Sequence, residues 1–139
     1  MSQPAPPRPV AALLGWRGTG FLARLALCGA YLLGGLTKLA DFPAAVAEQA
    51  HMGLAPPALF AALTIAVELI GPVLVLSGRL VWLGAGMLGV FTALAALVAN
   101  RFWAMPPGAE RFAATNAFFE HGGLVGGFVL VALLAGRGD

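Results

Sequence analysis

The sequence predicts an all-α integral membrane protein, a four-helix bundle with both termini in the cytoplasm. The first observation is composition: of 139 residues, 60% are hydrophobic and only 10% are charged, whereas a soluble domain carries roughly a quarter charged residues. The second is a series of four apolar stretches, each near the length of about 20 residues that crosses the hydrocarbon core. The third is the placement of the basic residues, which sets orientation.

The N-terminal residues 1–19 are expected to form a disordered or interfacial tail ahead of a membrane domain of residues 20–139. The first ten residues are rich in proline and have too little apolar surface to offset the entropy lost on ordering. Trp16 and Arg17 are residue types that anchor a chain at the membrane surface. A secretory signal with a cleavage pattern at residues 45–47 is the alternative interpretation of this region.

Four spans are expected, at about residues 20–40, 57–78, 80–101 and 115–135. Between the first two, residues 41–56 suit a short helix that lies in the headgroups. Ser77–Arg79 form a tight turn, and Pro106–Gly108 break the chain before the fourth span. The sequence therefore predicts a membrane domain with short connections and no soluble domain.

Basic residues indicate which side of the membrane each connection faces. An even number of spans places both termini on one side. That side carries five basic residues, Arg8, Arg17, Arg24, Arg79 and Arg137, and the other carries three, Lys38, Arg101 and Arg111. Because lysine and arginine favour the cytoplasmic side, both ends are expected inside.

Glu68 is the most informative residue, because it lies deep in an apolar span. It comes about 11 residues into the second span, roughly 16 Å at 1.5 Å per residue. A carboxyl group at that depth is costly unless it faces the bundle interior and has a partner or a proton. We interpret Glu68 as a proton-carrying or ligand-contacting group. The alternative is a structural carboxyl group that holds a neighbouring helix in register.

Several other polar groups are expected in the same leaflet as Glu68. They are Lys38 at the end of the first span, Asn100 and Arg101 at the end of the third, and Glu120 and His121 in the opening turns of the fourth. We expect them to line a pocket that opens outward, with an ion pair between Arg101 and Glu120. Glu68 is expected either to pair with Lys38 or to stay protonated. Arg101 as a headgroup anchor, and the Glu120–His121 pair as a polar helix start, are the alternatives.

The fourth span also carries a cluster of glycines that predicts close helix packing. Two overlapping GxxxG registers are formed by Gly122, Gly123, Gly126 and Gly127. Small residues let helices approach closely in lipid. The pattern does not distinguish contacts inside the bundle from contacts between two copies of the chain.

Other motifs are missing from the sequence, and their absence excludes several functions. There is no HExxH motif and no cluster of ligating residues, so no metal site is expected. Only His121 is placed to ligate a haem inside the bundle, so no intrinsic cofactor is expected. A basic run with interleaved aromatic residues is also missing, which argues against nucleic acid as a partner.

Several short sequence motifs occur in a characteristic order along the chain. The first span runs from Arg24 through spaced glycines to Lys38-Leu39, residues 53–56 read Gly-Leu-Ala-Pro, and Glu68 is followed by Gly71 and Gly78. Asn116 and the glycines of residues 122–127 follow in the last span. This order resembles the DoxX family of small four-helix bacterial membrane proteins. Pro72 departs from it, since the family often has a second glycine there.

The resemblance implies a multi-pass protein of the bacterial inner membrane. Some relatives are linked to quinone-dependent sulfur oxidation, and others to membrane-tethered redox-defence complexes. The leading hypothesis is therefore an accessory or quinone-interacting subunit of a redox-linked membrane system, with a quinone as ligand. The expected partners are the lipid bilayer, a membrane or peripheral oxidoreductase subunit, and a second copy of the chain. A small proton-coupled transporter or permeability factor and a non-catalytic scaffold are the alternatives, and enzymatic activity is left open.

Overall fold

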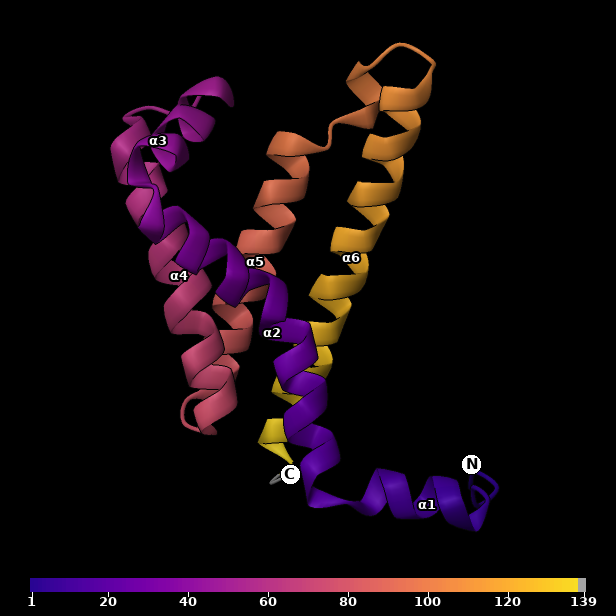
Figure 1. Cartoon of the computed structure of the whole chain (residues 1–139). Coiled ribbons are helices and arrows are strands. Elements are labelled where there is room, and N and C mark those ends of the chain that lie inside the picture. The colour runs from indigo at the N-terminus through magenta and orange to yellow at the C-terminus, as the bar shows by residue number, and fades with distance from the viewer. Residues whose placement is uncertain (138–139) are drawn as a thin grey trace.

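The computed structural model describes residues 1–137, which form helices and connections only (Figure 1). The elements in chain order are α1 (Arg8–Gly15), α2 (Arg17–Ala40), α3 (Phe42–His51), α4 (Pro57–Ser77), α5 (Val81–Ala99), the short 3₁₀ helix η1 (Phe102–Ala104) and α6 (Ala109–Gly136). Within this described part, α2, α4, α5 and α6 are long and apolar enough to cross a membrane. The all-α membrane prediction is confirmed.

The four long helices converge at one end of the bundle and separate at the other (Figure 1). Helix α4 packs against both α2 and α5, and α5 packs along α6. Helix α2 crosses the bundle, so that it starts beside α6 and ends beside α3 and α4. It therefore meets α6 in the first part and the middle of its length, where Leu27 lies against Gly127 and Tyr31 packs on Phe128.

Both described ends of the chain lie at the convergent end, where α1 runs across the bundle axis (Figure 1). No residue of α1 is buried, and Leu13, Leu14 and Trp16 are exposed. A short helix with apolar and basic residues that lies across the spans suits the membrane surface. Because α1 begins at Arg8, the disorder expected of residues 1–10 is wrong for residues 8–10.

Several helix boundaries differ from the sequence prediction. Helix α6 begins at Ala109, six residues before the expected start at residue 115. Gly108 supplies the break with a φ of 149°, and Glu110 lies in the first turn, where a negative charge favours the helix dipole. Helix α5 ends at Ala99, so Asn100 and Arg101 lie beyond the α-helix, although the apolar candidate span continues to Ala104.

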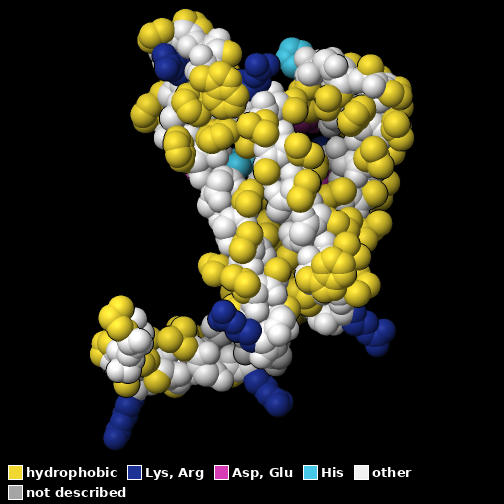
Figure 2. Space-filling view, turned by 180° about the vertical axis from the view of Figure 1, so that it is seen from behind, with side chains coloured by type: hydrophobic (Ala, Val, Ile, Leu, Met, Phe, Trp, Pro, Cys, Tyr) yellow, Lys and Arg dark blue, Asp and Glu magenta, His cyan; other side chains and the backbone are white. Residues whose placement is uncertain are grey.

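The buried core lies toward the convergent end. Its members are mostly apolar and come from all four spans: Cys28, Tyr31, Val75, Ala85, Leu88 and Phe128. The one phenol in this core is satisfied, because the Tyr31 hydroxyl and the Thr92 hydroxyl share a hydrogen bond. Most other large apolar side chains face outward (Figure 2), as expected where lipid replaces water.

Glycine brings the central pair of helices into direct backbone contact. A Cβ at Gly84 of α5 would lie 2.6 Å from the Gly71 carbonyl oxygen of α4. The predicted glycine contacts of α6 are different. A Cβ at Gly122, Gly123 or Gly126 would meet no atom within 4 Å, and only Gly127 has a neighbour, Leu27, at 3.4 Å. Packing of the other three against a second copy stays a prediction.

We predict that Gly84→Ala destabilises the bundle. The added methyl group would collide with the backbone of α4, a type of overpacking that costs about 1–3 kcal/mol. Thermal unfolding of the detergent-solubilised protein measures the effect. Gly86→Ala is the matched control, because it lies on the same helix with no atom within 4 Å of its Cβ position. Equal unfolding temperatures for the two variants would contradict the assigned contact.

Candidate functional site

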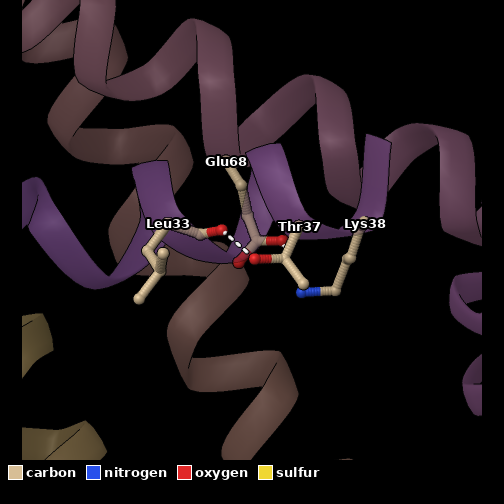
Figure 3. Close-up of polar contacts among 4 residues, drawn as sticks. All are labelled: Leu33, Thr37, Lys38 and Glu68. Carbon is tan, nitrogen blue, oxygen red and sulfur yellow. Dashed lines mark hydrogen bonds and ion pairs between the residues drawn. The ribbon is translucent and has the colours of Figure 1, made fainter. Parts of the chain in front are cut away.

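An ion pair joins the first and second spans. The Lys38 Nζ donates to Glu68 Oε1 at 2.9 Å (Figure 3). The Glu68 side chain is 8% exposed and the Lys38 side chain is 19% exposed. The expected pairing of Lys38 with Glu68 is therefore present, and one member of the pair remains accessible from outside the bundle.

A pair of glycines on α2 makes room for this contact. A Cβ at Gly34 would lie 2.9 Å from Glu68 Oε2 and 3.4 Å from Lys38 Nζ. A Cβ at Gly35 would lie 2.7 Å from the side chain of Leu69. The Glu68 carboxylate is thus seated against the α2 backbone, in a space that any larger residue would fill. Sequence reasoning missed this role, although the adjacent glycines were a visible signal.

Proline adds a second local feature at Glu68. Pro72 lies inside α4, four residues after Glu68, and is buried. Because proline has no N–H group, it cannot donate the usual helical hydrogen bond to the carbonyl oxygen of the residue four positions before it. The backbone carbonyl of Glu68 therefore lacks its ordinary helical donor, directly beside a buried carboxylate.

The Lys38 ammonium group has N–H donors that the contact with Glu68 does not use. An ammonium group has three N–H donors, and within residues 1–137 its one side-chain acceptor is Glu68. The neighbouring Thr37 hydroxyl donates instead to the Leu33 carbonyl oxygen of its own helix, at 2.7 Å (Figure 3). Lys38 also lies in the last turn of α2, where the helix dipole favours a positive charge.

The remaining predicted site residues do not join this pair by any described hydrogen bond or ion pair. Arg101 and Glu120 are exposed, and the ion pair expected between them is not found among the described residues. The His121 Nδ1 lies 2.7 Å from the Ala117 carbonyl oxygen of its own helix. Asn100 ends α5, and its backbone N–H donates to the Ala96 carbonyl oxygen.

Aromatic packing joins η1 to α6 in place of the expected ion pair. The ring of Phe118 meets the rings of Phe102 and Trp103 edge to face, with centroids 5.4 and 5.5 Å away. Such pairs favour this geometry. The packing of these rings therefore holds the turn after α5 against α6. The Arg101 side chain in this turn is exposed to solvent.

Two apolar grooves lie on the surface of α5. One, of about 420 Å³, lies between α5 and α6 and is floored by Gly86, Gly89 and Phe128. The other, of about 380 Å³, runs along α5 and reaches Val67 of α4. None of the six predicted pocket residues lines either groove. The candidate site therefore consists of Lys38 and Glu68, and a ligand role for the other four stays a prediction.

The DoxX family model matches residues 20–101 of the sequence. The chain belongs to the DoxX family. The match covers α2, α3, α4 and α5, and so it includes Lys38 and Glu68, whereas Glu120 and His121 lie outside it. Comparisons with curated proteins and with solved structures found no match. Family membership and four apolar helices together make this an integral, multi-pass membrane protein.

We predict that Lys38→Met destabilises the protein more than the double variant Lys38→Met/Glu68→Gln. The single change leaves a buried carboxylate without its partner, which costs about 3 kcal/mol, at the lower end for buried pairs because Lys38 is partly exposed. The second change removes the stranded charge and restores most of the loss. The free energy of unfolding is measured for Lys38→Met, for Glu68→Gln and for the double variant, which together form a double-mutant cycle. Strictly additive effects would show that the pair is not coupled.

Proposed function

We propose that this DoxX protein is a quinone-interacting accessory subunit of a redox-linked membrane system. The observation that carries the proposal is the Lys38–Glu68 ion pair, a charged hydrogen-bonding group set in the membrane-spanning part of the chain. Ionisable residues within spans are expensive and usually mark a pathway or a binding site. Substrate-binding clefts in general combine apolar walls with a few placed polar groups.

The residues at the pair suit a quinone headgroup. The Lys38 ammonium group has N–H donors that Glu68 does not use, and these would hydrogen-bond a carbonyl oxygen. Its partial exposure gives a ligand access from the lipid side. Leu33 and Leu69 supply apolar surface on α2 and α4. A bound quinone would supply two-electron, two-proton chemistry, and Glu68 would accept or release a proton next to it.

The proposal includes a place in the cell. Five arginines gather toward the end of the bundle where both described termini lie, which supports a cytoplasmic location for that end. With the bacterial inner membrane as its location, the Lys38–Glu68 pair would lie toward the periplasmic half. The electron-transferring partner would be an oxidoreductase subunit, since the sequence shows no electron carrier of its own.

We predict that purified wild-type protein retains quinone and that Glu68→Gln and Lys38→Gln retain at least about tenfold less. Loss of a hydrogen bond to a charged group costs about 1.5–3 kcal/mol, and each 1.4 kcal/mol is tenfold in affinity. Organic extraction of the detergent-purified protein, followed by chromatography and mass spectrometry, counts quinone per chain. Glu110→Gln is the matched control, because its carboxylate is exposed in the first turn of α6.

Two outcomes would replace the proposal with an alternative. Proton flux in liposomes that requires Glu68 but no electron donor or quinone would identify a transporter, for which a buried carboxyl group is equally suited. Equal quinone retention by wild type, Glu68→Gln and Lys38→Gln, with all three folded, would leave the pair as a structural contact of a scaffold.

A further inference from the structure

The convergent end of the bundle carries arginines without acidic neighbours. Arg8 and Arg17 lie on α1 and at the start of α2, Arg79 lies in the α4–α5 turn, and Arg137 follows α6. Basic side chains stand out at this end in Figure 2. The described carboxylates are elsewhere in the fold, in the α2–α4 connection, in mid-α4 and in the first half of α6: Asp41, Glu48, Glu68, Glu110 and Glu120.

Arg24 differs from the other arginines in its depth. It lies seven residues into α2, about 10 Å from the start of the helix at 1.5 Å per residue. Cys28 and Tyr31 follow it by four and seven residues, and both are buried in the core. Residues at this spacing share one face of a helix. The stem of Arg24 therefore starts on the core-facing side of α2, while part of the side chain remains exposed.

The guanidinium group of Arg24 has an unsatisfied donor. Its Nε atom is buried and has no hydrogen-bond partner within the described residues. The side chain as a whole is only partly buried, so a ligand can reach the outer nitrogen atoms of the guanidinium group, whereas the Nε atom itself is enclosed by the protein. A buried N–H group without an acceptor is costly, and more so when it carries charge. No carboxylate among the described residues pairs with Arg24, so the exposed end of its guanidinium fork suits an anionic acceptor from outside the bundle.

Phosphate is the anion that best fits this position. The fixed fork of a guanidinium group binds phosphate oxygens through two parallel hydrogen bonds. At the convergent end, lipid headgroups supply phosphate directly above the apolar span. Arg17 lies seven residues before Arg24, on the same face of α2 and at the membrane surface, where it adds a second positive charge. Clusters of basic residues next to a span attract anionic lipids.

We propose that Arg24 binds the headgroup phosphate of one anionic phospholipid, held at the start of α2 with Arg17 as the second cation. The lipid is favoured over free phosphate because Arg24 lies within the apolar span, where Phe21, Leu22 and Leu25 of α2 expose apolar surface to acyl chains. The site is separate from the Lys38–Glu68 pair and holds whether or not that pair binds a quinone.

Native mass spectrometry of the full-length protein tests the proposal. The protein is stripped of lipid in detergent and then titrated with phosphatidylglycerol, with phosphatidylcholine or with inorganic phosphate. We expect one phosphatidylglycerol to bind at least tenfold more tightly than phosphatidylcholine. Arg24→Gln should lose this preference. Arg8→Gln is the matched control and should keep it, because Arg8 is exposed at the start of α1.

Each remaining outcome has a defined meaning. Equal losses in Arg24→Gln and Arg8→Gln would overturn the proposal in favour of general charge attraction. Binding of inorganic phosphate as tight as that of the lipid would overturn the lipid assignment. Arg24→Lys keeps the charge without the fork and should bind with intermediate affinity. If Arg24→Gln does not fold, the wild-type protein and Arg24→Lys still test the site. A wild-type protein that binds phosphatidylglycerol and phosphatidylcholine equally would refute it. So would an Arg24→Lys variant that binds phosphatidylglycerol as tightly as the wild type.

Discussion

A carboxyl group in an apolar span needs a partner or a proton, and the partner of Glu68 ties α2 to α4. Lipid offers Glu68 neither water nor counter-ions, and the Lys38 ammonium group reaches it from the adjacent helix. The reach is short because Gly34 removes the side chain that would otherwise occupy the space of the carboxylate. The Lys38–Glu68 ion pair therefore depends on the glycine at position 34, which leaves space for the carboxylate.

The position of the pair relative to the core explains why a binding role suits it. Lys38 follows the core residue Tyr31 by seven positions on α2, and Glu68 precedes the core residue Val75 by seven on α4. Both differences place the pair about 10 Å from the core, toward the end where the helices separate. The convergent end supplies rigidity through packed side chains, and the divergent end leaves a charged group within reach of a ligand.

The spans and the central residue could be predicted from sequence, but the grouping of the other site residues could not. The need for about 20 apolar residues makes a span visible without knowledge of its neighbours, and Glu68 stands out against such a span. Which faces meet depends on three-dimensional fit. Gly84 and Gly34 make the close contacts, whereas the conspicuous glycines of α6 mostly face outward. The packing of Phe102 and Trp103 on Phe118, which the sequence did not predict, likewise holds the chain after Arg101 against α6.

Lys38 is the only lysine in the chain, which allows a direct test of the central pair. Protein labelled with ¹⁵N-lysine in detergent should show one side-chain ammonium resonance by NMR. We expect this resonance to be visible, because an ammonium group held by a shielded carboxylate exchanges slowly with water, and to broaden or shift strongly in Glu68→Gln. A resonance identical in wild type and Glu68→Gln, with the exchange rate of a free lysine, would contradict the ion pair.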